Sequence, residues 1–344
     1  MADADWQALL PPLFEAAGID VAGGFSVAPL TGGVSSDIVR VTLANGQQYC
    51  AKRALPQLKV ASVWEAPLER NHYEAAWLRK AGEILATAAP AVIAEDEDNG
   101  VVLLEYLPPA KFRLWKLELL AGRADPRTPV AVADALGRIH AATLNDPVTA
   151  AAFATDALFD ALRLDPYLRT LAQRIPALRE PILACLAETA ATKIALVHGD
   201  VSPKNILVSN VDGHPVLLDA ECAWYGDPAF DAAFCLNHLL LKAVHVTEIR
   251  GPLLVQAAAF PAIWLAHFPE DMRRDAERRV ATLLPCLMLA RVDGKSPVEY
   301  LGPVEQETVR DIAMPLVASP VSTVGGVLAR VAAHLAIDDE GILT

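Results

Sequence analysis

Three polar side chains occur within one short stretch of the sequence, and their types and spacing suit phosphoryl transfer. Asp200 is followed five residues later by Asn205, and Asp219 ends the next apolar run, Val-Leu-Leu-Asp. Phosphoryl transfer from ATP needs metal ions that bridge the phosphates, and a carboxylate that orients the attacking hydroxyl and receives its proton. Mg²⁺ prefers oxygen ligands and usually takes only one or two from the protein. Asn205 and Asp219 are therefore candidate Mg²⁺ ligands, and Asp200 is a candidate base.

The residues between these side chains predict a β-hairpin. Residues 206–208 form an apolar strand, 210–213 a turn and 216–218 the returning strand. Such a hairpin brings Asn205 and Asp219 to the same end of two neighbouring strands. Taken singly, each polar residue is equally well explained as a turn former beside a hairpin. The whole set, from His198 to Asp219, favours a functional site.

The motifs in this region resemble those of the aminoglycoside phosphotransferase and choline kinase family. The resemblance rests on His-Gly-Asp at 198–200, Asn205, Leu-Asp-Ala-Glu at 218–221, and Gly-Asp-Pro at 226–228 followed by Asp231. It implies ATP, or alternatively GTP, as phosphoryl donor with Mg²⁺. It also implies Asp200 as catalytic base, Asn205 and Asp219 as metal ligands, and Asp231 as an anchor for the backbone of the catalytic loop.

The chain before residue 107 is expected to form a small antiparallel sheet with one or two helices. Asn45-Gly46 is a strong hairpin signal, because these residue types tolerate the positive φ angles of a two-residue turn. A small kinase lobe requires the order strand, strand, strand, helix, strand, strand. The expected ranges are a helix at 4–17, two strands around 31–33 of which the second covers 38–43, a strand at 47–54, a helix at 68–80, and strands at 91–94 and 101–106.

Beyond Pro108-Pro109 the hydrophobic pattern becomes helical. We expect an α+β, bilobal protein-kinase-like fold. It comprises a nucleotide-binding lobe at 1–107, a hinge at about 104–109, and a larger, mainly α-helical lobe at 108–344 with the catalytic loop, 196–221, and the acceptor pocket. The predicted helices lie near 130–144, 154–173, 178–191, 228–243, 246–267, 271–291, 298–317 and 321–336.

A glycine-containing turn is a candidate phosphate-binding loop. Gly32, Gly33, Ser35 and Ser36 lie between two predicted strands, where glycines let the backbone approach phosphate and Ser hydroxyls add hydrogen bonds. The alternative is an ordinary Gly-Gly hairpin turn, because the stretch matches neither G-x-G-x-x-G nor the Walker form.

A Lys–Glu pair is expected behind this loop. Lys52 ends the third strand, and the resemblance implies that it neutralises the α and β phosphates. Glu74, on the following helix, could hold Lys52 in place. The alternatives are that Lys52 is a surface residue, that Arg53 takes its place, or that Glu65 or Glu69 is the partner.

Further residues are assigned by the resemblance. The hinge implies adenine contacts to the backbone near Glu105 and Leu107, although the same residues could simply end a buried strand. His198 is expected to support the loop rather than transfer protons. Glu221, two residues after Asp219 and on the same side if the strand continues, could support the metal or contact the nucleotide. Asp227, before Pro228, is interpreted as a helix N-cap.

The composition excludes several classes of protein. A formal net charge of −13 argues against nucleic acid or an anionic membrane as partner. The five cysteines are widely spaced without a CxxC pair, which favours reduced core residues. The first residues are acidic and lack a signal region. The longest uncharged run, 253–268, is too short to span a bilayer. We therefore expect a cytoplasmic protein without a membrane partner; the sequence does not indicate an oligomeric state.

Three departures from protein kinases indicate a small-molecule hydroxyl as acceptor. Ser202 stands where protein kinases commonly have Lys, Asp-Ala-Glu replaces Asp-Phe-Gly, and residues 222–230 are too few for a regulated activation loop. An atypical protein kinase and a non-catalytic nucleotide-binding regulator remain alternatives. An antibiotic-like acceptor and a choline, sugar or homoserine type of metabolite are both open. The polar break at 291–297 could contact the acceptor or be a solvated loop.

Overall fold

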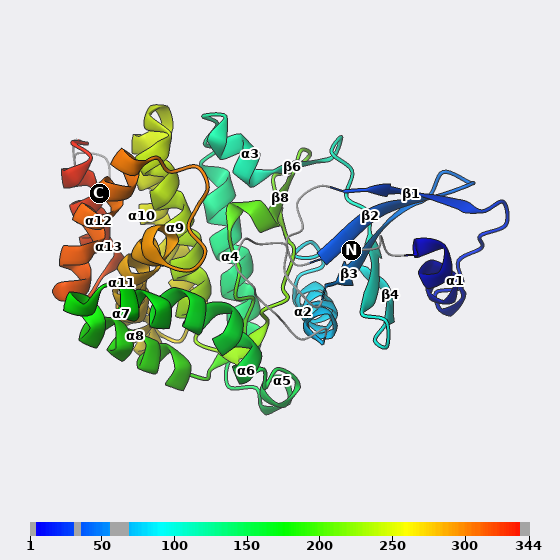
Figure 1. Cartoon of the computed structure of the whole chain (residues 1–344), viewed down its shortest axis with the longest axis horizontal. Coiled ribbons are helices and arrows are strands. Elements are labelled where there is room, and N and C mark those ends of the chain that lie inside the picture. Colours follow the sequence, from blue (N-terminus) through cyan, green and yellow to red (C-terminus); the bar gives the residue numbers. More distant parts are fainter. Residues whose placement is uncertain (1–4, 31–35, 56–68, 338–344) are drawn as a thin grey trace.

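The computed structural model describes residues 5–30, 36–55 and 69–337, and it has the two lobes that the sequence predicts. Figure 1 shows the sheet lobe at one end of the molecule and the helical lobe at the other, with strand β8 of the catalytic hairpin between them. The predicted fold class, a small antiparallel sheet lobe followed by a mainly helical lobe, is confirmed.

The N-terminal lobe is a five-stranded antiparallel sheet in the order β1-β2-β3-β5-β4. Side chains alternate between its faces, so Leu103 packs against α1 while Val102 packs with α2. Lys52 on β3 lies directly opposite Val102 on β5 and therefore projects from the α2 face. The elements are α1 (Trp6–Ala16), β1 (Phe25–Pro29), β2 (Ser36–Leu43), β3 (Gln48–Ala54), α2 (Arg70–Ile84), β4 (Val92–Asp96) and β5 (Val101–Glu105).

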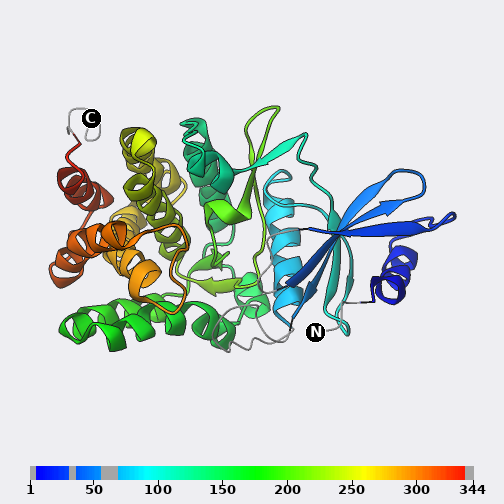
Figure 2. The same ribbon diagram turned by 45° about the horizontal axis from the view of Figure 1, so that its top comes forward.

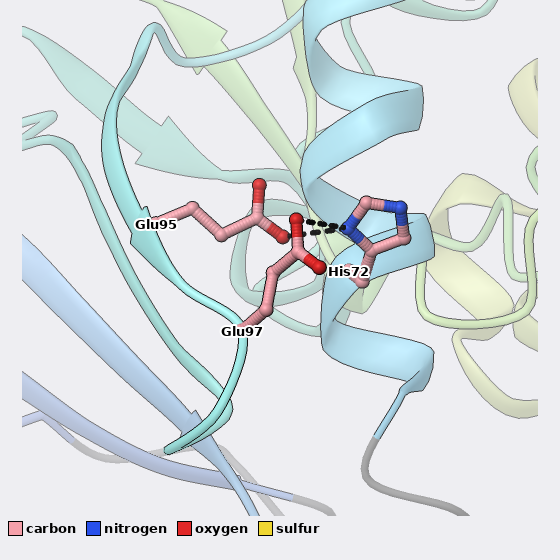
Figure 3. A group of neighbouring side chains, drawn as sticks. All are labelled: His72, Glu95 and Glu97. Carbon is pink, nitrogen blue, oxygen red and sulfur yellow. Dashed lines mark hydrogen bonds and ion pairs between the residues drawn. The ribbon is translucent and has the colours of Figure 1, made fainter.

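An ion-pair cluster ties α2 to the strand β4. His72 Nδ1 lies 3.0 Å from Glu95 Oε1 and 3.4 Å from Glu97 Oε1, as Figure 3 shows. Arg79, two turns further along α2, places its guanidinium 2.6 Å from the other oxygen of Glu95. The three residues in Figure 3 are of metal-ligand type, but Glu95 already has cationic or hydrogen-bonding partners on both oxygens. We interpret the cluster as a link between helix and sheet.

Two small sheets carry the catalytic segment of the second lobe. The predicted hairpin is present, with Ile206 opposite Leu217, and β6 extends it to the order β6-β8-β9. A second pair joins β7 to β10. The sequence patterns did not indicate β6, β7, β10 or the short helices α3 and α5. The bounds are β6 (Phe112–Leu114), α3 (Trp115–Leu120), α4 (Arg127–Ala142), α5 (Pro147–Ala152), β7 (Ala195–Val197), η3 (Pro203–Asn205), β8 (Ile206–Ser209), β9 (Pro215–Leu217) and β10 (Trp224–Gly226).

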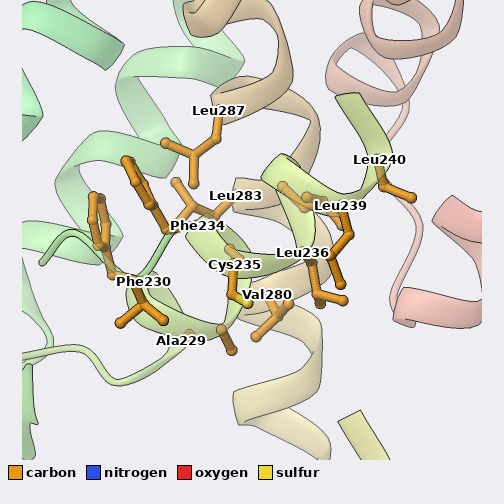
Figure 4. Packing of buried hydrophobic residues seen from close by; sticks show 14 of the residues in the cluster. Ala229, Phe230, Phe234, Cys235, Leu236, Leu239, Leu240, Val280, Leu283 and Leu287 are labelled. Carbon is orange, nitrogen blue, oxygen red and sulfur yellow. The ribbon is translucent and has the colours of Figure 1, made fainter. Parts of the chain in front are cut away.

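Helix α9 is the centre of the second lobe. Nearly all of its side chains are buried, and Figure 4 shows Phe234, Leu236 and Leu239 packed with Leu283 and Leu287 of α11. In Figures 1 and 2 the segment from η1 to α8 runs along one side of the bundle of α9 to α13. The bounds are α8 (Arg179–Ala191), α9 (Ala229–His245), η4 (Thr247–Ile249), α10 (Arg250–Leu265), α11 (Glu270–Asp293), α12 (Pro303–Ala318) and α13 (Val324–His334).

Two predicted helices differ from the structure for local reasons. The range 154–173 is divided into α6 (Asp156–Phe159), a π-helical segment η1 (Asp160–Arg169) and α7 (Thr170–Arg174), followed by the 3₁₀ turn η2 (Pro176–Leu178). Pro166 lies inside η1 and has no N–H for the α-helical ladder. The prediction that a helix starts at 298 was wrong. Helix α12 begins at Pro303, because the Gly302 N–H donates a hydrogen bond to the Glu305 carboxylate and Pro is suited to the first helical position.

Within residues 5–30, 36–55 and 69–337, no single helix is long and apolar enough to span a membrane. Helix α9 and the segment Thr247–Leu265 meet that criterion only when taken together, and a bend of 118° separates them.

Candidate active site

The backbone of the catalytic loop is fixed by one buried carboxylate. Asp231, in the first turn of α9, accepts hydrogen bonds from the N–H groups of His198 (2.7 Å) and Gly199 (2.8 Å). His140 Nε2 lies 3.2 Å from the same carboxylate. Gly199 has φ of +79°, and a Cβ there would lie 2.7 Å from the carbonyl oxygen of Cys222, so the turn requires glycine. Hydrogen bonds to Asp231 therefore fix the backbone of the loop that carries Asp200.

His198 joins three parts of the site. The N–H of Asp200 donates to His198 Nδ1 (3.1 Å), so Nε2 carries the hydrogen and donates to the carbonyl of Leu218 (3.1 Å). The ring also lies edge-on to Trp77 of α2, with centroids 4.7 Å apart. Burial lowers the pKa of His198 below its ordinary value, so the ring is neutral at pH 7. Both ring nitrogens are occupied by backbone groups, which suits support of the loop rather than proton transfer.

Asn205 and Asp219 meet at one end of the hairpin. The N–H of Leu218 donates to the carbonyl of Asn205 (2.9 Å), and Asn205 Nδ2 donates to the carbonyl of Asp200 (3.1 Å). Because the hydrogen bond to the Asp200 carbonyl uses Nδ2 of Asn205, the side-chain oxygen of Asn205 does not take part in that bond. The structure thus brings together two oxygen donors of the kind that Mg²⁺ binds.

The chain does not stay extended after the hairpin. Strand β9 ends at Leu217, and Asp219 has φ of +65°, in the left-handed region that non-glycine residues rarely adopt. The expectation that Glu221 follows Asp219 on an extended strand was therefore wrong. Glu221 instead accepts from Arg70 Nε of α2 at 3.0 Å. Arg70 also donates to the carbonyl of Leu55, 2.6 Å away, so it joins β3, α2 and the segment after Asp219.

Lys52 lies between two carboxylates. Its Nζ is 2.7 Å from Glu74 Oε2 and also contacts Asp219 Oδ1. Burial alone would lower the pKa of Lys52, but Asp219 and Glu74 raise it above its ordinary value, so Lys52 is charged. Burial would raise the pKa of Asp219, but Lys52 holds it below its ordinary value. Of the alternatives to this Lys–Glu pair, Glu65 lies outside the described residues.

The Asp200 carboxylate has two cationic partners that sequence reasoning missed. Oδ2 lies 2.9 Å from Arg163 of η1 and 3.0 Å from Lys204, four residues along the loop. Arg163 also donates to the carbonyl of Gly199 and to that of Leu162. Burial would raise the pKa of Asp200, but Lys204 and Arg163 hold it below the ordinary value, so the group is a carboxylate at neutral pH. The position of Lys204 in the motif was a usable signal; nothing near Arg163 in the sequence pointed to Asp200.

The other residues expected to contact the nucleotide lie in the glycine-containing turn and at the hinge. Gly32, Gly33 and Ser35 lie outside the described residues. Ser36 is buried, and its hydroxyl has no hydrogen-bond partner among the described residues. At the hinge, the N–H of Glu105 donates to the carbonyl of Ala91 (2.8 Å), so this N–H is already in use. Leu107 follows the strand and is half-buried.

The sheet lobe carries the buried Lys52–Glu74 pair, and the helical lobe carries Asp200, Asn205 and Asp219 on the catalytic loop and hairpin. Together with the two-lobed architecture, these residues define a protein of the kinase-like class. Residues 26–263 match the profile of the Phosphotransferase enzyme family, and the chain belongs to this family. The resemblance found in the sequence is thereby confirmed.

Known proteins similar to this chain include several small-molecule kinases. Methylthioribose kinase of Pectobacterium atrosepticum is 24% identical over 227 residues, which is 58% of this chain and 56% of that protein. The chain thus spans just over half the length of this curated relative.

Two solved structures share the fold. They are an ethanolamine kinase of Plasmodium vivax (TM-score 0.53, 14% identity, 86% of this chain and 84% of that one) and a macrolide 2′-phosphotransferase of Brachybacterium faecium (TM-score 0.51, 17% identity, 98% and 99%).

The Asp231 anchor predicts a specific loss of order. Asp231→Asn removes one acceptor oxygen and leaves a loop N–H facing an amide, which should lower the free energy of unfolding by about 2–4 kcal/mol. Hydrogen exchange at the amides of His198 and Gly199 should become faster. Asp311→Asn, at an exposed position of α12, is the matched control. Unchanged protection of both amides would contradict the anchoring role.

Proposed function

We propose that the protein transfers the γ-phosphoryl group of ATP to a hydroxyl group of a small molecule. One observation carries the proposal: side chains from separate segments form one connected group around Asp200. Lys52 contacts Asp219, the residue before Asp219 bonds to Asn205, and Asn205 bonds to the backbone of Asp200. Membership of the phosphotransferase enzyme family supports this reaction class. GTP remains an alternative donor.

Asp200 has the state expected of the group that orients the acceptor. It is an ionised carboxylate, held by a rigid loop and paired on one oxygen with Arg163 and Lys204. In a loose phosphoryl-transfer transition state the hydroxyl keeps its proton until late, so a weak base in the right place suffices. We propose that Asp200 accepts a hydrogen bond from the acceptor hydroxyl and receives its proton as the new P–O bond forms.

The donor set fits a magnesium ion. The Asn205 amide oxygen and the Asp219 carboxylate are two oxygen ligands, which matches the few protein ligands that Mg²⁺ takes beside nucleotide phosphates. When bound, Mg²⁺ would supply positive charge that neutralises the phosphate oxygens. Lys52, positioned by Glu74 at 2.7 Å, would bind the phosphates from the sheet side.

The segment after Asp219 supports a small acceptor. Residues 221–230 are all buried, and β10 within them pairs with β7 beneath the catalytic loop. A protein substrate of a regulated kinase binds along an activation loop at this point of the chain. Here the same stretch is part of the core, so we propose a small molecule as acceptor.

Substitution of Asp200 tests the reaction directly. Asp200→Asn should lower Mg²⁺-dependent ADP release with an acceptor by roughly 10²–10⁴-fold, the size of a general-base effect. Asp212→Asn, in the exposed turn of the same hairpin, should leave the rate unchanged. The acceptor panel would contain antibiotics, amino alcohols, sugars, sugar acids and hydroxy amino acids. Phosphorylation that survives in Asp200→Asn would show that another group holds the hydroxyl.

The two neighbouring cations of β3 provide a test of nucleotide binding. Lys52→Met should weaken ATP binding about 10–100-fold, because a charged hydrogen bond to phosphate is lost. Arg53→Met alters the adjacent residue, which points to the other side of the strand, and should have little effect. Binding can be followed with a fluorescent ATP analogue, while thermal unfolding checks that the variants are folded. Equal losses in both variants would contradict the assignment of Lys52.

A further inference from the structure

A group of basic side chains on α3, η1, η3, α9 and the last turn of α11 begins at Asp200, which contacts two of them. Arg163 contacts Asp200, and its guanidinium carbon lies 5.9 Å from the ring centroid of Tyr167. Arg291 donates to the phenol oxygen of the same Tyr167 at 3.1 Å. We call the following residues the basic cluster: Lys116, Arg163, Lys204, His238, Lys242 and Arg291.

Helix α9 supplies one wall of the basic cluster. Phe234, His238 and Lys242 are spaced by four residues and therefore lie on one face of the helix. Phe234 stacks near Arg163, with the guanidinium carbon 5.8 Å from its ring centroid, and its ring centroid is 5.2 Å from that of His238. The face thus leads from the catalytic carboxylate towards Lys242.

Lys242 is buried without a counter-ion. Its side chain is 1% exposed, and its Nζ lies 3.5 Å from the Tyr300 hydroxyl and 4.9 Å from the centroid of that ring. Among the described residues, no carboxylate lies within ion-pair distance of Lys242. A buried ammonium group without a carboxylate partner is unfavourable for folding, so the position calls for a reason other than stability.

Arg291 likewise has no charged partner among the described residues. Its hydrogen-bond partners are the hydroxyl of Tyr167 and the carbonyl and hydroxyl of Ser296, all of them neutral. Its Nε is buried and has no partner among the residues that the structure describes. A guanidinium has five N–H donors that match a carboxylate or a phosphate.

The carboxylates nearby are already in use. Glu299 pairs with Lys116, and Glu305 accepts from His245 (2.8 Å) and from the N–H of Gly302 (2.6 Å). Asp200 is shared by Arg163 and Lys204. A chain with a net charge of −13 therefore concentrates uncompensated positive charge next to its catalytic residue.

We propose that the acceptor carries a negatively charged group, a carboxylate or a phosphate, which binds to Lys242 and Arg291 while its hydroxyl meets Asp200. This rests on the proposed function and specifies the substrate class for it. A cationic acceptor such as an amino alcohol or an aminoglycoside would face like charges, and a neutral one would leave Lys242 unpaired.

The titration of Lys242 provides a separate signature. Burial, together with the nearby Lys116 and Arg291, lowers the pKa of Lys242 to about 7, while Glu299 and Cys235 act in the opposite direction. His238 on the same face is neutral, since burial and the surrounding cations lower its pKa. An anion bound to Lys242 raises its pKa. Binding at pH 8 should therefore take up a proton, and binding at pH 6 should not.

The test compares acceptors that share a carbon skeleton and carry a negatively charged, neutral or positively charged group. A three-carbon series would contain D-glycerate, glycerol 3-phosphate, glycerol and 3-amino-1,2-propanediol; a six-carbon series would contain gluconate, glucose 6-phosphate, glucose and glucosamine. For each compound, Mg²⁺-dependent ADP release gives kcat/KM. Calorimetric titration of the full chain with ADP and Mg²⁺, in buffers of different ionisation enthalpy, gives the affinity and the proton uptake. The two anions of each series distinguish a carboxylate from a phosphate.

We expect an anionic member to exceed its neutral counterpart by about tenfold or more in affinity or kcat/KM, and the cationic member to be the poorest. Lys242→Met should abolish this preference and the proton uptake at pH 8. The variant should also unfold a few degrees higher, because it removes an unpaired buried charge. Lys193→Met is the matched control: Lys193 also lies over an aromatic ring, 4.6 Å from the centroid of Trp224, but it pairs with Asp156.

The outcomes separate the two proposals. A preference for neutral or cationic members, a preference that survives Lys242→Met, or no anion-dependent binding in either series would overturn the anionic acceptor. Phosphoryl transfer to a neutral or cationic compound in preference to its anionic counterparts would overturn it while supporting the proposed function. Anion binding that depends on Lys242 but leads to no ADP release with any compound would support the anion site and count against the kinase activity.

Discussion

Charged groups that are removed from water need partners, and this constraint determines how the two lobes meet. Lys52 on the sheet contacts Glu74 on α2 and Asp219 beyond the catalytic hairpin. Arg70, one turn before Glu74, pairs with Glu221. Because the Lys52–Asp219 and Arg70–Glu221 pairs join the small lobe to the segment that follows β9, they fix α2 relative to the catalytic hairpin. Buried backbone groups also need partners, and the Asp231 carboxylate accepts hydrogen bonds from two N–H groups of the catalytic loop.

In the basic cluster, two cationic groups lack charged partners among the described residues. Lys242 is as buried as Lys52 but has only Tyr300 beside it, and Arg291 bonds only neutral oxygens within the described residues. Natural proteins tolerate such conflicts mainly at functional sites, where a ligand provides the missing partner. Lys193, by contrast, has both a ring and a carboxylate beside it, and the proposed anionic acceptor would give Lys242 the charged partner that it lacks.

Much of the fold and of the site could be predicted because the signals are local. The hairpin, the Asn45-Gly46 turn and the Lys52 and Glu74 positions follow from patterns of a few residues. Arg163 beside Asp200 and Arg291 in the basic cluster could not be found in this way, because both come from distant helices and are brought in by packing. The path of the chain after Asp219 was missed since a left-handed residue ends the strand. The π-helical η1 and the start of α12 depend on single prolines, whose effects a periodicity analysis averages out.

The central claim is that Asp219 and Asn205 hold the metal while Asp200 acts on the acceptor. Binding of Mn²⁺ in the presence of ADP, followed by electron paramagnetic resonance, tests this division of roles most directly because Mn²⁺ takes the same oxygen ligands as Mg²⁺. Asp219→Asn should weaken Mn²⁺–ADP binding about tenfold or more, since a charged ligand is lost. Asp200→Asn should bind Mn²⁺–ADP as the unaltered protein does. Equal loss of binding in both variants, or none in Asp219→Asn, would contradict the account.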